Sequence, residues 1–584
     1  MFSPASQDPA WHLSASRLPA NWQRTHSFVL LDTAFAFDRL AATCAAFDAA
    51  PGECIRIHYL TVCPAGTPAP ELPPGCPALW TRFQRELLEG WPLPLPGIHQ
   101  TSLLDGRIQL SIAFGETDTQ VRLFDAVCDA LFLDGRVPVP ASALARLSRT
   151  GATLSIESAS QPQADALAKA GFEISPTPPE GSFSGAFRVR KRTVTPDHTG
   201  CGPPGERTAL IIGAGLAGTA VASALAARGW DVSLLEREPI PAAGASGNLA
   251  AVFSPLLSLD DGRASRLSRA CFLRLLEELR HLERAALPAL WQACGVLQLP
   301  RSEKEEAHFR ELVLKHAYPE RYVRFLEKDA AQDRTGQVLP SGGWFFEEGG
   351  WVNPPSLCAA RIAAHPRIKP HFGQDVQSLE HHAGRWTARG PAGQELASAP
   401  LLVLANAWEA NRLLPQPGLP FKRVRGQVAH LPIGSVPQIK CVLSKDGYLA
   451  PAVQGLHCLG ATYDFGSEDP SLNPDAHSRN LERLAQLLPE APPPLEAPAL
   501  GRVGFRTLTP DRMPTAGALP PGSPGEEAHP RLYCLLGLGS RGLVWSTLLG
   551  EYLASLIEGT PSPLPLDLAA HLSPGRFGTS RAKK

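Results

Sequence analysis

The sequence lacks the cysteine spacings of a metal site or of a disulfide framework. Its 12 cysteines are scattered, with no CxxC pair and no neighbouring Cys/His cluster. Structural zinc is therefore not expected, whereas reduced thiols are, as in proteins of the cytoplasm. We predict no bound metal and a cytoplasmic location.

Long apolar runs and an excess of charge are also absent. No uninterrupted apolar run is long enough to cross a bilayer. The opening residues, MFSPASQDPAWHLSA, have no cationic start followed by an apolar core, so we expect no signal peptide. A net charge of -1 over 584 residues argues against a general nucleic-acid coat, although local basic patches can still bind RNA. The length favours two or three domains. Because no apolar run is long enough to cross a bilayer, we expect no membrane partner.

Glycine is missing at a place where a nucleotide-binding turn would need it. The stretch FVLLDTAFAFDRLAA ends its apolar run on Asp32 and continues with Ala34, Ala36 and Asp38. A Cβ atom at such positions blocks close approach of the backbone to a ligand, and Asp38 adds a negative charge. Two interpretations are open at this point: a cofactor site that has been lost, or a segment that never bound a cofactor.

A change in composition divides the chain near residue 190. A basic stretch runs into polar Gly/Pro sequence, and a new apolar strand starts at Ala209. Such composition is typical of an interdomain linker. We predict one domain over residues 1–190, a linker over 191–207 and a second domain over 208–584. Upstream, apolar runs alternate with helical stretches, which predicts an α/β domain with a mostly parallel sheet. The downstream α/β domain is expected to contain a more antiparallel middle.

The segment TALIIGAGLAGTAVASALAARGWDVSLLERE is the most informative of the chain. An apolar strand runs into Gly213, Gly215 and Gly218 with GxGxxG spacing, and an alanine-rich helix follows. These glycines permit a tight turn, close approach to a pyrophosphate and close packing of helix on strand. A second strand ends in Glu236, whose carboxylate can accept hydrogen bonds from ribose hydroxyls. This half of the chain is predicted to bind FAD or NAD.

Resemblance to a known family favours FAD. GASGNLAAVFSPLLS is a small-residue loop soon after Glu236, and it resembles the flavin-facing loop of the D-amino-acid-oxidase-like FAD enzymes, which include glycine oxidase. LLVLANAWEA, GRVGFRTLTPDRMPTAG and LLGLGSRGLVWS resemble later segments of that family in the same order. The resemblance implies an FAD-binding Rossmann domain with an antiparallel-sheet substrate domain. It also implies Ser246 and Asn248 as cofactor contacts.

A flavin amine oxidase with a glycine-like substrate must also hold a carboxylate. Guanidinium groups suit this purpose because they are permanently charged and make two parallel hydrogen bonds. By position, Arg506 in GFRTLTPD and Arg541 in GSRGL match the carboxylate-contacting arginines of the glycine-oxidase type, and Tyr448 in KDGYLAP matches its substrate-side tyrosine. Arg425 is a lesser candidate, and Gln427 is expected only to hold its loop. The alternative for each arginine is a surface ion pair, the usual fate of Arg.

A second resemblance covers nearly the whole chain. RELLEGWPLPLPGIHQ, IQLSIAFGETD and DALFLDG resemble the bacterial bifunctional proteins of tRNA 5-methylaminomethyl-2-thiouridine biosynthesis, as do GGWVNP, RGQVAHLP and GATYDFGSED further on. This implies an N-terminal Rossmann-like methyltransferase-type domain that uses S-adenosylmethionine, followed by the FAD oxidoreductase. The family acts on the wobble uridine of certain tRNAs. Its FAD domain removes the carboxymethyl group from a carboxymethylaminomethyl substituent, and its methyltransferase domain then methylates the amine.

The resemblance answers the question left open by the missing glycines. The family has a Gly-rich cofactor turn where this chain has Ala34, Ala36 and Asp38. The family's acidic residue for the ribose falls at Cys63, whose thiol cannot replace the paired acceptors of a carboxylate. Asp134, in DGRVPVPAS, remains as the candidate amine-binding or proton-accepting residue. We expect that the fold has persisted while the site for the methyl donor has been lost.

Four functions are compatible with these patterns. The first is an FAD enzyme acting on a tRNA wobble uridine, with an N-terminal domain that no longer methylates. The others are the full bifunctional enzyme, a free glycine or amino-acid oxidase with a scaffold domain, and an RNA-binding flavoprotein without turnover. Basic residues at the predicted linker and in the tail could pair with tRNA phosphates, or could simply be solvated: Arg188, Arg190, Lys191, Arg192, Arg576, Arg581, Lys583 and Lys584. The patterns do not determine the oligomeric state.

Overall fold

The computed structural model describes residues 11–70, 78–188, 206–414, 418–490, 500–520 and 531–577. The chain folds as two compact units. One comprises Met1–Gly202 with Ser555–Ala569, and the other comprises Pro203–Ala554 with Ala570–Lys584. Of the predicted linker, only Glu206 and Arg207 lie within the described residues.

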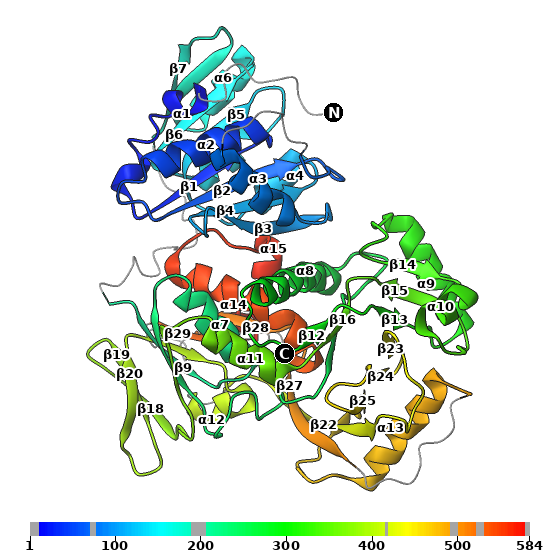
Figure 1. Ribbon diagram of the computed structural model, residues 1–584. Helices are drawn as coiled ribbons and strands as arrows, with labels where there is room; N and C mark the ends of the chain where they lie inside the picture. Colours follow the sequence, from blue (N-terminus) through cyan, green and yellow to red (C-terminus); the bar gives the residue numbers. More distant parts are fainter. Residues whose placement is uncertain are drawn as a thin grey trace, which may run out of the picture. The chain divides into compact units, whose positions relative to one another are not determined.

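The N-terminal unit is built on an eight-stranded sheet of order β3-β4-β2-β1-β5-β6-β8-β7 (Figure 1). The strands from β4 to β6 in this order are parallel, and β3, β8 and β7 add antiparallel edges. The mostly parallel sheet predicted from the apolar runs of this half is confirmed, whereas the antiparallel edges were not predicted. The strands are β1 Ser27–Asp32, β2 Arg56–Cys63, β3 Gly97–Leu103, β4 Ile108–Phe114, β5 Cys128–Asp134, β6 Ser148–Glu157, β7 Phe172–Thr177 and β8 Ser182–Phe187.

Both faces of this sheet are buried. On β1, Leu30 belongs to one hydrophobic core and the adjacent Leu31 to a second core. Successive strand residues point to opposite faces, so a nearly continuous apolar strand is what a sheet covered on both sides requires. The helices of the unit are α1 Trp11–Ala15, α2 Phe37–Ala49, α3 Ala78–Glu89, α4 Thr117–Leu123, α5 Ala141–Leu147 and α6 Gln161–Lys169.

The C-terminal unit contains a six-stranded sheet of order β17-β10-β9-β21-β29-β28. All its pairs are parallel except β28 with β29. Its strands are β9 Thr208–Ile212, β10 Asp231–Leu235, β17 Ile368–His371, β21 Leu401–Leu404, β28 Thr515–Ala518 and β29 Leu532–Leu536. The helices α7 Leu216–Ala226, α8 Arg263–Arg284 and α11 Pro354–Ala363 belong to the same unit, as does α14 Gly542–Glu558 as far as Ala554.

A buried ion pair joins these helices. Arg361 on α11 is fully buried and donates to Glu278 on α8 from Nε at 2.8 Å and from Nη2 at 2.7 Å. The same guanidinium donates to the hydroxyl of Thr547 on α14 and to the carbonyl of Leu216 at the start of α7. Burial alone would raise the pKa of Glu278, but the Arg361 guanidinium outweighs burial and holds that pKa below its ordinary value. The pair therefore fixes the helix that follows the glycine-rich turn.

The second large sheet of this unit has nine strands, as the antiparallel middle of the sequence predicted. Helix α13 (Pro474–Leu487) packs against it at β22 and β25 (Figure 1). The strands run in the order β14-β15-β13-β23-β24-β25-β22-β26, with β27 also paired to β22. They are β13 Val296–Gln298, β14 Arg324–Leu326, β15 Gly343–Phe346, β22 Lys422–Pro432, β23 Val442–Ser444, β24 Tyr448–Leu449, β25 Leu456–Gly460, β26 Asp464–Phe465 and β27 Gly501–Leu508.

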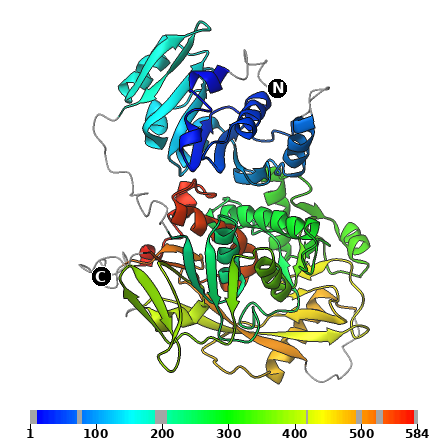
Figure 2. The ribbon, with the colours of Figure 1, turned by 60° about the vertical axis from the view of Figure 1, so that its left-hand side comes forward.

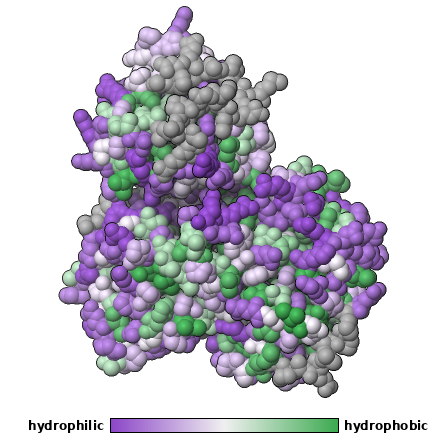
Figure 3. All heavy atoms as spheres, in the orientation of Figure 1, coloured by the Kyte–Doolittle hydropathy of each residue, from purple (hydrophilic) through white to green (hydrophobic). Residues whose placement is uncertain are grey.

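Smaller elements complete the unit. A three-stranded sheet, β18 Ser378–His382, β19 Arg385–Arg389 and β20 Glu395–Ala399, lies beside β9 (Figures 1 and 2). A second one consists of β11 Ala251–Phe253, β12 Trp291–Gln292 and β16 Gly350–Val352. Hydrophilic residues dominate the surface over α9 (Glu303–His316) and α10 (Lys328–Thr335) in Figure 3. The short helix α12 Ala410–Leu413 belongs to this unit, whereas α15 Leu566–Ala569 belongs to the N-terminal one.

Membrane-crossing helices and metal-binding clusters are both absent from the described residues. None of the described helices has both the length and the apolar character that crossing a membrane needs. Within the same ranges, no group of three or more His, Cys, Asp or Glu side chains could hold a metal ion. The ten described cysteines are all free thiols.

Candidate functional site

The glycine-rich turn lies between β9 and α7, at the carboxyl end of the central parallel strand. Gly213 has φ of +101°, and a Cβ atom there would lie 2.8 Å from the carbonyl oxygen of Ala405. A Cβ atom on Gly218 would lie 1.7 Å from the carbonyl oxygen of Gly213. Side chains at these two positions are therefore excluded by backbone atoms. Gly215 is the N-cap residue of α7 and has no side chain of its own at the amino end of the helix, where an anion is favoured.

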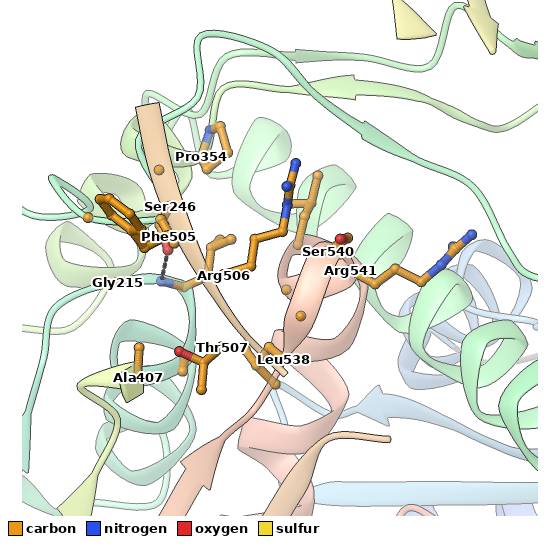
Figure 4. A pocket seen from close by; sticks show the side chains of 18 of the residues that line it. Gly215, Ser246, Pro354, Ala407, Phe505, Arg506, Thr507, Leu538, Ser540 and Arg541 are labelled. Carbon is orange, nitrogen blue, oxygen red and sulfur yellow. Dashed lines mark hydrogen bonds between the residues drawn. The ribbon is translucent and has the colours of Figure 1, made fainter. Parts of the chain in front are cut away.

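The remaining predicted cofactor contacts surround this turn. Glu236 follows β10, and its carboxylate accepts a hydrogen bond of 2.8 Å from the amide of Ala214. The hydroxyl of Ser246 accepts one of 3.1 Å from the amide of Leu216 (Figure 4). Asn248 lines the same cavity. The carboxylate and the hydroxyl thus hold the turn in place while facing the space in front of it.

A large cavity of about 1250 Å³ opens in front of the turn. Its walls come from the six-stranded sheet, the 243–256 loop, β22, β24, β27 and the start of α14. In the view of Figure 4, Gly215 and Ser246 lie towards one end and Arg541 towards the other, with Arg506 between them. The volume exceeds that of common small-ligand pockets, which is what a dinucleotide cofactor together with a substrate requires.

Several guanidinium groups in this cavity lack an anionic partner among the described residues, and Arg506 and Arg541 are two of them. Arg506, on β27, donates to the carbonyl of Thr462 at 3.1 Å, and its guanidinium carbon lies 5.5 Å from the ring centre of Tyr463. Arg541, in the 3₁₀ turn η3 (Gly539–Arg541), donates to the carbonyl of Ser254 at 3.1 Å. Burial lowers the pKa of Arg541 to about 10 and also lowers the pKa of Arg506. Partly buried cations without carboxylates are suited to an anionic ligand.

Tyr448 also lines the cavity, but its hydroxyl already has a partner. It donates to the carbonyl of Ala250 at 2.8 Å and lies 3.3 Å from the sulfur of Cys458. Burial raises the pKa of Tyr448 well above its ordinary value, so the phenol is neutral. In this arrangement the hydroxyl joins β24 to the 250 loop.

Arg425 and Gln427 behave differently from Arg506. Arg425 is buried and donates to the carbonyls of Asp469 and Ser471 and to the side chain of Gln427. Gln427 in turn exchanges hydrogen bonds with the backbone of Asn473. Both side chains hold the 469–473 loop, and neither is among the residues that line the cavity.

Comparison with known proteins gives the family. A family model described as FAD dependent oxidoreductase matches residues 208–556, and one described as S-adenosyl-L-methionine-dependent methyltransferase matches residues 79–189. A protein of Aromatoleum aromaticum, named tRNA 5-methylaminomethyl-2-thiouridine biosynthesis bifunctional protein MnmC, is 40% identical over 97% of this chain and 92% of its own length. The chain belongs to this MnmC family. The MnmC protein of Azoarcus sp. is 39% identical over the same shares of the two chains.

Solved structures agree with this assignment at the level of the fold. Glycine oxidase from Bacillus cereus aligns with a TM-score of 0.51 and 22% identity over 60% of this chain and 97% of its own. Iminodiacetate oxidase from Chelativorans sp. aligns with a TM-score of 0.52 and 23% identity over 63% and 98%. The predicted glycine-oxidase-like fold of the C-terminal half is confirmed.

The MnmC family is FAD-dependent through this half, and the residues present fit FAD. The turn excludes side chains where a pyrophosphate would approach, and Glu236 follows the second strand, where an adenosine ribose would be bound. Three buried polar atoms of cavity-lining side chains have no hydrogen-bond partner in the described chain: Oδ1 of Asn406, Nη1 of Arg502 and Oγ1 of Thr507. When bound, the flavin supplies the acceptor for a hydride.

Sequence reasoning missed Arg502 and Tyr463. Arg502 lies four residues before Arg506 on β27, and residues at this spacing share one face of a strand. Its guanidinium donates to the carbonyls of Ala243 and Gly244 in the loop that faces the cavity. The spacing within GRVGFR could have revealed Arg502. No local pattern indicates that Tyr463 lies against Arg506.

The other predicted residues lie elsewhere. Asp134 ends β5 in the N-terminal unit and forms an ion pair with Arg136 at 2.8 Å. Arg188 pairs with Glu173 at the surface. Arg576 pairs with Asp511 at 2.9 Å and is only 14% exposed, so its predicted role in binding phosphate is not supported. The remaining basic residues of that prediction, Arg190, Lys191, Arg192, Arg581, Lys583 and Lys584, lie outside the described residues.

Proposed function

We propose that this chain removes the carboxymethyl group from 5-carboxymethylaminomethyl-(2-thio)uridine at the wobble position of tRNA. The reaction takes a hydride and a proton from the N–CH2–COO⁻ group, which leaves a C=N bond. Water then cleaves that bond, so that the base keeps a primary aminomethyl group and the lost carbons leave as glyoxylate. The two electrons pass to FAD. The proposal also assigns the protein to the cytoplasm.

The observation that carries this proposal is the presence of Arg506 and Arg541, which have no anionic partner among the described residues, in a cavity that begins at a dinucleotide-binding turn. The substituent on the base is in effect a glycine attached through its nitrogen, and its carboxylate is the natural partner of such a cation. Arg506 is held against the ring of Tyr463, and Arg541 is held by the carbonyl of Ser254. Both cations are therefore positioned before an anion arrives, and each charge-assisted hydrogen bond contributes about 1.5–3 kcal/mol.

Aromatic and basic side chains near these arginines support a nucleic-acid substrate. Tyr463 and Phe465 are 38% and 61% exposed, and their ring centres lie 5.3 Å apart. The guanidinium carbon of Arg423 lies 4.0 Å from the ring centre of Phe505. Tyr463, Phe505 and Arg423 all line the cavity. Exposed rings stack on nucleobases, and cations contact phosphates. This part of the cavity wall therefore suits a base presented from an RNA chain.

The test uses the full-length protein with FAD and tRNA that carries the carboxymethylaminomethyl group. Nucleosides are analysed by mass spectrometry, and glyoxylate is measured in the same reaction. We expect aminomethyluridine and glyoxylate in equal amounts, and both formed more slowly by Arg506→Lys at a tRNA concentration below KM. Arg389→Lys, on the outlying strand β19, is the matched control and should retain the activity.

Free glycine and free iminodiacetate provide the opposing arm of the test. An unchanged tRNA together with hydrogen peroxide formed from either small substrate would overturn the proposal in favour of a free amino-acid oxidase. An unchanged tRNA with no reaction of either small substrate would also overturn it.

A further inference from the structure

The N-terminal unit has the fold of a methyltransferase, and its fold dictates where a donor would bind. The chain order reverses at β1, because β2 and β4 extend the sheet on one side and β5 and β6 extend it on the other. Ligands of such sheets bind in the crevice outside the carboxyl ends of the strands at this reversal. The residues at those ends are Asp32 on β1, Cys63 on β2, Asp134 on β5 and Glu157 on β6.

In this crevice the carboxylate of Asp32 is bound by an arginine of the chain itself. Arg39, in the first turns of α2, donates to the two oxygens of Asp32 from Nε at 3.0 Å and from Nη2 at 2.9 Å. Tyr59 on β2 donates to the same carboxylate at 2.7 Å. Arg39 is 4% exposed and Asp32 is fully buried. Asp32 therefore has three side-chain hydrogen bonds within the protein, and little capacity is left for a ligand.

The guanidinium of Arg39 also closes the loop that would face the cofactor. It donates to the carbonyl of Ala34 in the β1–α2 connection, and from Nη1 to Glu157 at 3.2 Å. Burial would lower the pKa of Arg39, but the carboxylates of Asp32 and Glu157 outweigh burial and raise it further. The cation thus occupies the space between the ends of β1 and β6.

The other carboxylates at this edge are likewise paired within the chain. Asp134 accepts from Arg136 through both oxygens, from Nε at 2.9 Å and from Nη2 at 2.8 Å. Glu157 lies 3.8 Å from Arg136 and 3.8 Å from His12, in addition to its bond from Arg39. The candidate amine-binding residue of the sequence analysis is therefore engaged with a neighbour two residues away.

The residues of the crevice do not fit S-adenosylmethionine in two further respects. Cys63 ends β2, where a ribose-binding fold places an acid, and burial raises the pKa of its thiol. Ala34 and Ala36 replace the glycines that would let the backbone approach the ligand. The match to the methyltransferase family model begins at residue 79, beyond this loop.

We infer that the guanidinium of Arg39 has taken the place of the methyl donor, and that the N-terminal unit binds no S-adenosylmethionine. The unit keeps the fold because an internal ion-pair network fills the crevice. If the proposed function holds, the tRNA leaves this protein with a primary amine. Any methyl group on that nitrogen must then come from a separate N-methyltransferase.

The first test measures donor binding directly. The full-length protein, loaded with FAD, is titrated with S-adenosylmethionine and with S-adenosylhomocysteine by calorimetry, and its thermal unfolding is followed with and without each compound. A methyltransferase known to bind S-adenosylmethionine is titrated in parallel, which shows that the solutions of both compounds are active. We expect no saturable heat of binding at donor concentrations up to about 1 mM, the upper end of the range in which enzyme sites commonly bind their substrates. We also expect no shift in the unfolding temperature. Saturable one-to-one binding with a raised unfolding temperature would overturn the inference.

A second test separates this inference from the proposed function. The tRNA reaction is run with methyl-labelled S-adenosylmethionine, and the nucleosides are analysed for label. Unlabelled aminomethyluridine supports both claims. Labelled methylaminomethyluridine overturns this inference while leaving the oxidative step intact. If the oxidative step fails, a tRNA that already carries aminomethyluridine is supplied, and labelling of its amine again overturns the inference.

Discussion

Arg506 lies over the backbone of Gly426, on the neighbouring strand. A Cβ atom on Gly426 would lie 2.2 Å from Nη1 of Arg506, so the glycine leaves the space that the guanidinium occupies. The two strands, β22 and β27, pair along eight consecutive residues of each, which fixes this relationship. The absence of a side chain on one strand therefore decides where the cation of the other strand is held.

Replacing Gly426 should displace the arginine without affecting the cofactor. In Gly426→Ala the methyl group forces the guanidinium to move, and we expect kcat/KM for the tRNA substrate to fall about 10-fold, the equivalent of one charge-assisted hydrogen bond. The FAD content should be unchanged. Gly575→Ala is the control, because its Cβ atom has only an ordinary contact of 3.4 Å. Equal activity of the two variants would contradict the assignment of Arg506.

Loss of the fixed guanidinium fork should weaken substrate binding more than it affects the flavin. Lysine keeps the charge but cannot make two parallel hydrogen bonds. We expect Arg506→Lys and Arg541→Lys each to lower kcat/KM about 10- to 100-fold, mainly through KM, as measured by initial rates over a range of tRNA concentrations. Wild-type KM values in both variants would show that neither arginine holds the carboxylate.

The glycine-rich turn should not tolerate even a methyl group at its third glycine. In Gly218→Ala the new Cβ atom would lie 1.7 Å from the carbonyl oxygen of Gly213, so the turn or the helix must shift. We expect the purified variant to lack flavin absorbance and to gain none with added FAD. Circular dichroism provides the check that the variant is folded. A folded variant with a full complement of FAD would be contrary to this prediction.

The ion pair of Arg39 and Asp32 should stabilise the N-terminal unit. Arg39→Leu leaves the carboxylate of Asp32 buried without its cation, and breaking such a pair typically costs about 3–5 kcal/mol. We expect the free energy of unfolding of this unit to fall by about this amount. Hydrogen exchange of the backbone amides of β1 and β5 measures the change. Adding Asp32→Asn to Arg39→Leu should restore part of the loss. Identical stability of the single and double variants would show that the pair is not formed.

Stability of the C-terminal unit should depend on pH through Glu551 on α14. Burial would raise the pKa of Glu551, but Arg228 at 2.8 Å and Arg274 at 3.4 Å lower it to about 2, against an ordinary value of 4.5. Because the folded state favours the ionised form of Glu551, the contribution of this carboxylate to the free energy of unfolding is complete above pH 4.5. It is lost as the pH falls towards 2.

The substitution Glu551→Gln makes this dependence measurable. We expect it to destabilise the unit most at neutral pH, and the difference from the wild type to narrow below about pH 4.5. Denaturant unfolding at a series of pH values measures the difference. Glu380→Gln, at an exposed pair with Arg389, is the control and should have little effect at any pH. A difference that stays constant across the series would mean that Glu551 is not held ionised.

The predictable parts of this protein are those encoded by neighbours in sequence. The strand–turn–helix of Gly213, Gly215 and Gly218 could be read directly, because each glycine has a local steric task and Glu236 follows at a regular interval. Apolar runs of the N-terminal half gave the parallel strands, since strands buried on both faces are apolar throughout. The missing glycines at Ala34 and Ala36 predict a lost donor site, and the donor titration tests this prediction.

Only the tertiary structure decided which charged side chains meet. Arg39 and Glu157 are 118 residues apart in the sequence. No periodicity of the chain indicates that they lie in one crevice with Asp32. The same holds for Arg506, which shares its cavity with Arg541 and forms no ion pair among the described residues, whereas Arg576 is paired with Asp511. A sequence specifies that an arginine is charged. Whether that charge is neutralised by the protein or left for a ligand depends on which strands and helices pack together around it.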